Sequence, residues 1–444
     1  MSDTSTNVRW LPAFSRRSVA GLAARVLAVL TLLGLAPHFA AAQQFVGKTA
    51  PASGTMGQSP SVTLSWGTNP SAFRYEYCLG NIVDNDCGGS WTSAGLATSV
   101  TVTGLGYSTA YYWQVRAALF LTEPTPHTEY VYGDSGTWWC FATREGLRTD
   151  FDGDGRSDVL WHHATRGEVW LWTMNGAARV SETYVRTEAD TDWEIRGLGD
   201  QTGEGMADIL WWNKLTGMVY FWPMDGSTPL EEVYVATVDP AYDIVGTGDF
   251  NGDGKADILW RNPTVGDVWI WLMDGATMLS EVYVDTVDPG YLVKGVGDLN
   301  ADLKADLVWH GAAGDVWVWL MNGTTRLSQH YVGTVPDTRF LIRAVADFDG
   351  NGKADILWHH ATLGEVWMWP MDGAARLSET WVSTVPDTGF RIVAAGDHDG
   401  NGKADLLWHH ATHGEVWVWL IDGTTIVSET WVGTVPDVRY QIIW

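Results

Sequence analysis

The sequence has little positive charge, few cysteines and few charged residues of any kind. Its 444 residues include 27 lysines and arginines against 53 aspartates and glutamates, which gives a formal net charge of −26. Because contacts to phosphates need clustered Lys and Arg side chains, this balance argues against a protein that binds nucleic acid through basic patches. Charged residues make up only 18% and hydrophobic residues 45%, so the chain is not a disordered acidic tail.

Tryptophan and glycine are abundant instead. The chain contains 28 tryptophans and 49 glycines. Aromatic side chains favour strands, and glycine favours tight turns. The composition therefore predicts an all-β protein rather than a helical bundle, and the length is enough for two or three domains.

Residues 1–42 are typical of an export signal. Four arginines precede or begin an apolar stretch at 26–36, and three alanines at 40–42 match a cleavage site. The stretch is too short to span a bilayer, although an uncleaved anchor is the alternative. Arg16-Arg17 leaves twin-arginine export open beside ordinary secretion. We expect a secreted, cell-surface or periplasmic protein that does not insert into a membrane after the signal is removed.

All three cysteines lie in the first third of the chain. Cys78 and Cys87 are nine residues apart and flank a loop rich in Gly, Asn and Asp. A disulfide between them fits an oxidising compartment, and two free thiols are the alternative. Cys140 is left over, and we interpret it as a small apolar strand residue.

Residues 43–146 show the alternation of short strands. Val62, Leu64 and Trp66 alternate with polar residues, and similar segments recur within about 100 residues, which predicts a β-sandwich. The stretch GLGYSTAYYWQVRA at 104–117 resembles part of a fibronectin type III domain. That resemblance implies a buried role for Trp66 and a backbone hydrogen bond for Tyr111. It implies a spacer or accessory binding module.

Residues 147–444 consist of one unit repeated six times. The units begin with DFDGDGRSDVLW at Asp150 and recur at Asp200, Asp249, Asp298, Asp347 and Asp397, at intervals of 50, 49, 49, 49 and 50 residues. Each unit contains four strand-like segments, with an Asp-Gly or Asn-Gly turn after the second. Four strands in such a unit are the size of one propeller blade. The final segment Tyr440–Trp444 matches the fourth strand, so we predict a six-bladed β-propeller that this segment closes.

The acidic loops at the start of the units carry oxygen donors at regular spacing. Positions 1, 3, 5 and 9 are Asp or Asn, position 7 offers its backbone carbonyl, and hard oxygen ligands in this number suit Ca²⁺. We expect about four well-formed sites and two doubtful ones, at Asp200 and Asp298. The predicted metal ligands are Asp150, Asp152, Asp154, Arg156 and Asp158; Asp249, Asn251, Asp253, Lys255 and Asp257; Asp298, Asn300, Asp302 and Asp306; Asp347, Asp349, Asn351, Lys353 and Asp355; and Asp397, Asp399, Asn401, Lys403 and Asp405.

Two of these loops depart from the pattern. The second loop has Thr202 and Glu204 at positions 3 and 5. The fourth loop has Ala301 and Leu303 where the other loops have glycine, and a leucine at positive φ is strained.

The pattern DxDGxGxxD followed by a hydrophobic strand resembles the calcium-binding FG-GAP and VCBS repeats of integrin-α-like propellers. The resemblance covers about two thirds of the chain. It implies a secreted adhesion or recognition protein that binds glycans or extracellular proteins, without selecting a ligand.

The remaining polar residues do not form one catalytic constellation. His162-His163, His359-His360 and His409-His410 recur at strand ends in different units. We therefore expect polar strand-end residues and no catalytic residues. A carbohydrate-active lyase or glycosidase, or a purely structural surface protein, remains the alternative. The tryptophan pairs that recur in the units, such as Trp269 and Trp271, favour core packing over a sugar-stacking platform, and a repeated Trp-lined pocket between blades would favour a lectin.

Overall fold

The computed structural model describes residues 46–81, 90–106, 109–122, 125–143 and 148–444. The predicted export signal and Cys87 lie outside these residues, so neither the signal nor the disulfide to Cys78 is tested. The described chain is all-β apart from one 3-10 turn, η3 (Gly133–Gly136). Within these residues there is no apolar helix long enough to cross a bilayer.

The first part of the described chain forms two sheets around a common core. Trp66 and Trp113 are buried there together, and the N–H of Gly106 donates to Tyr111 Oη at 2.8 Å. Cys140 is a partly exposed free thiol. One sheet contains β1 (Lys48–Ala50), β3 (Val62–Trp66) and β6 (Ser99–Val102). The other contains β2 (Thr55–Gln58), β9 (Trp139–Thr143), β7 (Ala110–Leu121), β4 (Ala72–Gly80) and β5 (Thr92–Gly95), with β8 (His127–Tyr132) paired to β7.

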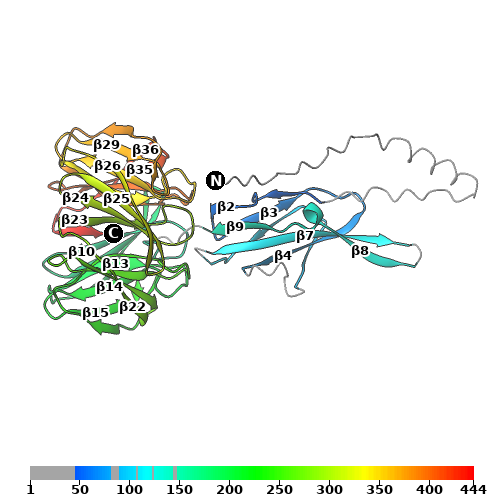
Figure 1. Cartoon of the computed structure of the whole chain (residues 1–444), viewed down its shortest axis with the longest axis horizontal. Coiled ribbons are helices and arrows are strands. Elements are labelled where there is room, and N and C mark those ends of the chain that lie inside the picture. The colour runs from blue at the N-terminus through cyan, green and yellow to red at the C-terminus, as the bar shows by residue number, and fades with distance from the viewer. Residues whose placement is uncertain (1–45, 82–89, 107–108, 123–124, 144–147) are drawn as a thin grey trace, which may run out of the picture. The chain divides into compact units, whose positions relative to one another are not determined.

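The repeats form six four-stranded antiparallel sheets, here called repeat sheets 1 to 6 and drawn from green to red in Figure 1. Repeat sheet 1 contains β10 (Val159–His163), β11 (Glu168–Asn175), β12 (Ala178–Thr187) and β37 (Tyr440–Ile443). Repeat sheet 2 contains β13 (Trp193–Gly199), β14 (Asp208–Asn213), β15 (Met218–Trp222) and β18 (Val233–Thr237). Repeat sheet 3 contains β19 (Asp243–Gly248), β20 (Asp257–Arg261), β21 (Asp267–Asp274) and β22 (Thr277–Thr286).

The other three repeat sheets follow the same order. Repeat sheet 4 contains β23 (Tyr291–Gly297), β24 (Asp306–Gly311), β25 (Asp315–Asn322) and β26 (Thr325–Thr334). Repeat sheet 5 contains β27 (Phe340–Ala346), β28 (Asp355–His360), β29 (Glu365–Trp369) and β32 (Thr380–Thr384). Repeat sheet 6 contains β33 (Phe390–Gly396), β34 (Asp405–His410), β35 (Glu415–Asp422) and β36 (Thr425–Thr434).

Proline explains why two sheets carry an extra small hairpin. Pro223 and Pro370 follow the third strands β15 and β29, and proline has no N–H to donate to a neighbouring strand. The strand is interrupted there and the hairpin tip pairs separately. The tips are β16 (Met224–Asp225) with β17 (Thr228–Pro229), and β30 (Met371–Asp372) with β31 (Ala375–Arg376).

Neighbouring repeat sheets pack face to face. One hydrophobic cluster joins Leu259 and Ile270 of repeat sheet 3 to Leu307 and Trp309 of repeat sheet 4. The first strands also contact one another in succession, from β13 through β19, β23, β27 and β33 to β37. A four-stranded sheet has two apolar faces to cover, and this succession covers both.

A closed set of backbone hydrogen bonds links the six acidic loops. The N–H at position 8 of each loop donates to the carbonyl at position 1 of the preceding loop, over 2.6 to 2.8 Å. The last bond runs from Ser157 to Asp397 and so joins the first loop to the sixth. The six donor and acceptor pairs are Ala207 and Asp150, Ala256 and Asp200, Ala305 and Asp249, Ala354 and Asp298, Ala404 and Asp347, and Ser157 and Asp397.

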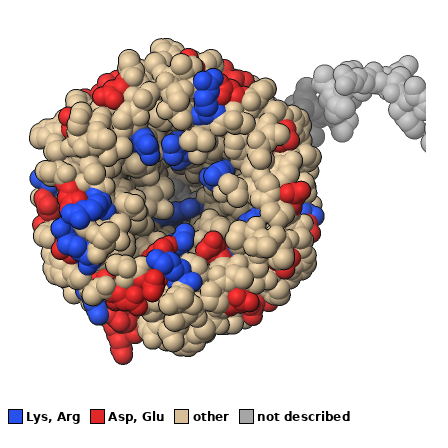
Figure 2. Space-filling model, turned by 90° about the vertical axis from the view of Figure 1, so that its left-hand side faces the viewer, with Lys and Arg blue, Asp and Glu red and all other residues tan. Residues whose placement is uncertain are grey.

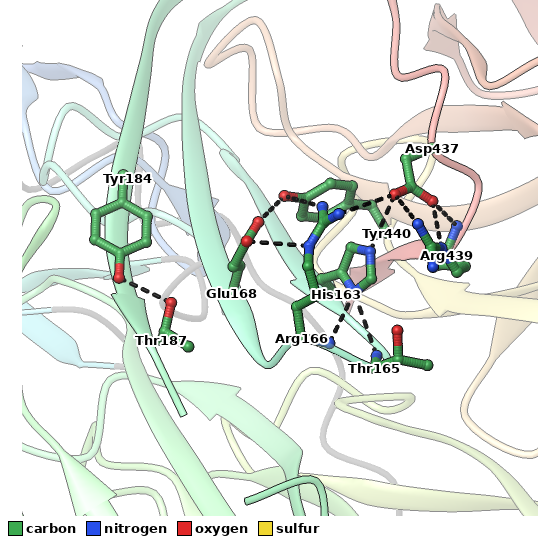
Figure 3. Close-up of polar contacts among 9 residues, drawn as sticks. All are labelled: His163, Thr165, Arg166, Glu168, Tyr184, Thr187, Asp437, Arg439 and Tyr440. Carbon is green, nitrogen blue, oxygen red and sulfur yellow. Dashed lines mark hydrogen bonds and ion pairs between the residues drawn. The ribbon is translucent and has the colours of Figure 1, made fainter. Parts of the chain in front are cut away.

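The C-terminal strand β37 pairs with β10, as the sequence predicts (Figure 1). Side chains reinforce this pairing (Figure 3): His163 Nε2 lies 3.1 Å from Asp437 Oδ2, and the Arg166 guanidinium donates to Tyr440 Oη at 3.1 Å. Tyr440 in turn donates to Glu168. The two ends of the repeat region are therefore joined by main-chain and side-chain bonds within one sheet.

Candidate metal centres and inter-sheet pockets

The first aspartate of each acidic loop organises the turn. In the fifth loop, Asp347 Oδ1 accepts the N–H of Gly350 at 2.7 Å and its Oδ2 accepts the N–H of Gly352 at 2.7 Å. Both glycines have positive φ, 77° and 82°, a conformation that glycine adopts without steric penalty. The carboxylate thus holds the loop in a tight curve around its own oxygens.

The aspartate at position 9 fixes the loop to the sheet. Asp355 Oδ1 accepts the N–H of Met371 at 2.8 Å, and its Oδ2 accepts the N–H of Phe348 at 3.3 Å. The equivalent carboxylates are also buried, and each makes the corresponding pair of bonds. They are Asp158, Asp208, Asp257, Asp306 and Asp405.

Three loops bring carboxylates from positions 1, 3 and 9 together. In each, the three residues offer oxygen atoms that all lie within 4.8 Å of one another. The groups are Asp150, Asp152 and Asp158; Asp347, Asp349 and Asp355; and Asp397, Asp399 and Asp405. Three carboxylates this close, in a curved loop that also presents backbone carbonyls, form a donor set that fits a hard divalent cation such as Ca²⁺.

The electrostatics of these loops favour a cation. The pKa of Asp150 is raised to about 7, chiefly by burial and also by the negative charges of Asp154 and Asp152, while its hydrogen bonds to backbone N–H groups act in the opposite direction. Burial likewise raises the pKa of Asp158 to about 8 and that of Asp405 to about 7. A raised carboxyl pKa means that the buried negative charge is disfavoured, and a bound cation would offset it.

The structure also places the residues at positions 5 and 7. Asp154 forms an ion pair with Arg156 at 2.8 Å and is not part of the three-carboxylate group. Lys255 pairs instead with Asp274 of its own hairpin, and Lys353 and Lys403 make the equivalent pairs with Asp372 and Asp422. These ammonium groups are therefore engaged outside the loop, and position 7 contributes only its carbonyl to the predicted ligand set.

The two divergent loops keep the turn. Asp298 Oδ1 and Oδ2 accept the N–H groups of Ala301 and Leu303, each at 2.7 Å, although these residues have φ of 63° and 65°. In the second loop Asp200 accepts the N–H of Gly203 at 2.6 Å. The backbone trace is therefore the same in loops that differ in their oxygen donors.

The histidine doublets have two separate roles. His359 packs edge to face on Trp408 of the next repeat sheet, with ring centroids 5.2 Å apart. His360 Nδ1 accepts the N–H of Leu363 at 2.8 Å, while its Nε2 lies 3.2 Å from Asp337. In two other sheets Asn213 and Asn262 accept the equivalent turn N–H groups. Sheet packing and turn capping thus account for these residues.

Aromatic pockets lie where one repeat sheet meets the next. The pocket between repeat sheets 2 and 3 has a volume of about 380 Å³ and is lined by Tyr242, Trp260, Trp269, Trp271 and Glu281. The pocket between repeat sheets 3 and 4 measures about 260 Å³ and that between repeat sheets 1 and 2 about 210 Å³. Their equivalent linings are Tyr291, Trp309, Trp317, Trp319 and Gln329, and Trp193, Trp211, Tyr220, Trp222 and Glu232.

Polar groups from both sheets surround these aromatic rings. Arg326 of repeat sheet 4 lies over Trp319 at 4.3 Å and forms an ion pair of 2.6 Å with Asp285 of repeat sheet 3. Arg186 and Glu232 make an equivalent pair between repeat sheets 1 and 2. The pockets at these two junctions therefore combine aromatic faces with an ion pair that joins the two sheets.

The outer strands expose an aromatic ring next to each junction. Tyr283 is 46% exposed, packs edge to face on Trp269, and shares a hydrogen bond of 2.7 Å with Thr286. The sequence carries a signal for this feature: in every unit an apolar, a polar and an aromatic residue follow one another at alternate positions. Our sequence interpretation missed this pattern. The exposed aromatic residues are Tyr184, Tyr234, Tyr283, Tyr331, Trp381 and Trp431.

Comparison with known families identifies the repeats. Residues 150–211, 200–260 and 298–358 match the FG-GAP-like repeat, and residues 241–284 match the FG-GAP repeat. No curated protein of similar sequence was found. The matches support an FG-GAP repeat protein.

Several solved structures share low similarity with the chain. AztD from Citrobacter koseri is 10% identical with a TM-score of 0.40, and the match covers 83% of this chain and 96% of that one. The Cps50 (Swd1) β-propeller domain from Myceliophteria thermophila is 10% identical with a TM-score of 0.35, over 83% and 98%. The Tc holotoxin pore of Photorhabdus luminescens is 13% identical with a TM-score of 0.39, over 78% of this chain and only 19% of its own.

Proposed function

We propose that this chain, which carries FG-GAP repeats, is an exported calcium-binding recognition protein that binds glycans through the junctions between its repeat sheets. The observation that carries the proposal is the recurrence of one aromatic pocket, with the same lining positions, at three successive junctions. A repeated pocket fits a ligand that itself repeats, and a glycan with several similar sugar units is such a ligand.

The chemistry of the pocket supports a sugar. The apolar face of a pyranose ring stacks on tryptophan or tyrosine, while its hydroxyl groups need fixed donors and acceptors. Trp317 and Tyr291 supply aromatic surface at one junction, and Gln329 and the ion pair of Arg326 with Asp285 supply the polar groups. Several weak sites on one rigid body would raise the overall avidity without any new contact.

Calcium has a structural role in this proposal. The three groups of carboxylates belong to loops that are joined to one another by backbone hydrogen bonds. An ion in one loop would therefore hold the preceding and following repeat sheets in register. We assign Ca²⁺ to the first, third, fifth and sixth loops, and leave the second and fourth as weaker sites.

The finer architecture belongs to the same proposal. We infer a six-bladed propeller, which is supported by six repeat sheets, six linked loops and the pairing of β37 with β10. Residues 43–146 are proposed as a fibronectin type III-like module, which is supported by the two-sheet core and the bond from Gly106 to Tyr111. Export through the segment 1–42 completes the proposal.

A glycan array with the full chain in millimolar calcium tests the function. We expect binding to a limited set of glycans, and loss of that binding in a variant that combines Glu232→Ala, Glu281→Ala and Gln329→Ala. Glu231→Ala is the matched control, because Glu231 is the exposed neighbour of Glu232 in the sequence and does not line the pocket.

Three outcomes would contradict the proposal. The first is an array without any bound glycan, and the second is a triple variant that binds as the wild type does. The third is the release of shortened sugars from a bound glycan, which would identify a glycosidase or lyase instead of a binding protein.

A further inference from the structure

The repeat region encloses a central hollow with a positively charged wall. Figure 2 shows the hollow at the centre of one face, with Lys and Arg side chains gathered around it. The first strands of the repeat sheets contact one another in succession, so they form the wall. A basic wall is unexpected in a chain with a formal net charge of −26.

Five of these strands contain a β-bulge at the same point. The pairing of β13, β19, β23, β27 and β33 with the next strand skips one residue at the same point. A bulge of this kind leaves one residue unpaired and re-aims its side chain, and it is common next to functional sites. The residues at the five bulges are Arg196, Val245, Lys294, Arg343 and Val393.

The cations of the wall fall into two environments. Arg196 lies 2.6 Å from Glu194 and 3.9 Å from Asp243, so its charge is balanced. Lys294 and Arg343, in β23 and β27, form no ion pair with any residue that the structure describes, and the same is true of Arg391 in β33. One part of the wall is therefore neutralised by the protein and the other is not.

The three unbalanced cations lie on neighbouring first strands, because β23 contacts β27 and β27 contacts β33. Burial lowers the pKa of Lys294, and the charge of Arg343 lowers it further. Burial also lowers the pKa of Arg343, and Arg391 adds to this effect. Arg343 is half-buried while Lys294 and Arg391 are exposed, and an anion bound among the three would offset their like charges.

One of these cations and a nearby histidine carry buried nitrogen atoms that have no hydrogen-bond partner among the described residues. His359 is only 2% exposed, and neither of its ring nitrogens has a hydrogen-bond partner among the described residues; the same holds for Arg343 Nε. His359 interacts electrostatically with both Arg343 and Arg391. Since buried polar atoms are nearly always hydrogen-bonded, the Nε–H group of Arg343 indicates that a further acceptor belongs here.

We propose that Lys294, Arg343 and Arg391 bind a small, multiply charged oxyanion in the hollow. Sulfate, phosphate and a small dicarboxylate share the required chemistry: several acceptor oxygens and at least two negative charges. The planar guanidinium groups bind such oxygens in pairs, and the lysine supplies a third charge. The anion can be a free ion or the acidic group of a sugar.

Isothermal titration calorimetry of the full chain in millimolar calcium tests this proposal. Sodium sulfate is titrated against sodium chloride of equal ionic strength, and a sulfated disaccharide is titrated in a second series. We expect one sulfate site per chain and an affinity that falls about tenfold or more in Arg343→Gln, a loss equivalent to one or more 1.4 kcal/mol steps. Tighter binding of the disaccharide than of sulfate would identify the sugar-linked anion, and equal binding the free ion.

Arg196→Gln is the matched control, because this arginine occupies the equivalent bulge but already has acidic partners. It should bind sulfate as the wild type does. Thermal unfolding provides a second readout: sulfate should raise the melting temperature of the wild type but not that of the variant with Lys294→Gln, Arg343→Gln and Arg391→Gln. The proposal would be overturned if the wild type bound sulfate no better than chloride. It would also be overturned if Arg196→Gln and Arg343→Gln lost sulfate affinity to the same extent.

Discussion

Replacement of Ala301 by glycine is expected to stabilise the protein. Ala301 has a φ of 63°, and the residue at the same place in the fifth loop is Gly350, with a φ of 77°. The left-handed conformation costs a residue with a Cβ atom about 1 to 2 kcal/mol. Glycine loses more chain entropy on folding, which costs about 0.5 to 1 kcal/mol. The difference predicts a gain of up to about 1.5 kcal/mol, with a central value of about 0.75 kcal/mol, because the hydrogen bond from residue 301 to Asp298 is retained.

Urea unfolding of the full chain in EDTA measures this gain without a contribution from calcium. The reverse change, Gly350→Ala, is the matched control and should lose at least a similar amount. A Cβ atom at Gly350 would lie 3.1 Å from Lys403 Cε and 3.2 Å from Lys403 Cγ, so crowding against this side chain adds to the loss. A loss of stability in Ala301→Gly, or no change in Gly350→Ala, would refute the view that backbone strain distinguishes these loops.

Three further predictions concern the metal, the closing strand and pH. Asp349→Ala removes an exposed carboxylate, so it should leave the melting temperature in EDTA unchanged but reduce the increase that calcium produces; an equal loss in both buffers would argue against a ligand role. Deletion of residues 440–444 removes β37 and about four backbone bonds worth about 1 kcal/mol each, and it exposes the edge of β10, so lower stability and aggregation are expected in size-exclusion chromatography. Burial, with repulsion by Arg343, lowers the pKa of His359 to about 4. The unfolded chain therefore takes up a proton at His359 at a higher pH than the folded chain does. As the pH rises from 4 to 6.5, the stability of the wild type relative to His359→Phe should increase by about 3 kcal/mol. A stability difference that does not change with pH would contradict the burial of His359.

The repeat sheets and their acidic loops could be predicted because their signals are local. The spacing of Asp150 and its equivalents, and the Asp-Gly turns, report strands and turns within one unit. The final segment around Tyr440 was predictable as a partner of β10 because it matches a strand that the first unit lacks. The sheets and loops depend on residues that are near one another in the sequence, and the long-range pairing with β10 followed from the strand that the first unit lacks.

The pockets and the charged hollow could not be predicted because they combine different units. Arg326 and Asp285 lie in adjacent repeat sheets, and nothing in either segment alone specifies that they meet. The bulge at Arg343 depends on strand register, which a pattern of alternate residues does not reveal. The role of Asp347 as an acceptor for two loop N–H groups was also missed, because sequence reasoning treated its oxygens only as metal ligands.

The calcium content of the purified protein tests the central claim most directly. The full chain is dialysed against calcium, freed of unbound metal and measured by mass spectrometry of the metal, with a parallel melt in calcium and in EDTA. We predict about four calcium ions per chain, one for each well-formed loop, and a higher melting temperature in calcium. Less than one ion per chain together with identical melting temperatures would contradict the claim that divalent cations hold the acidic loops.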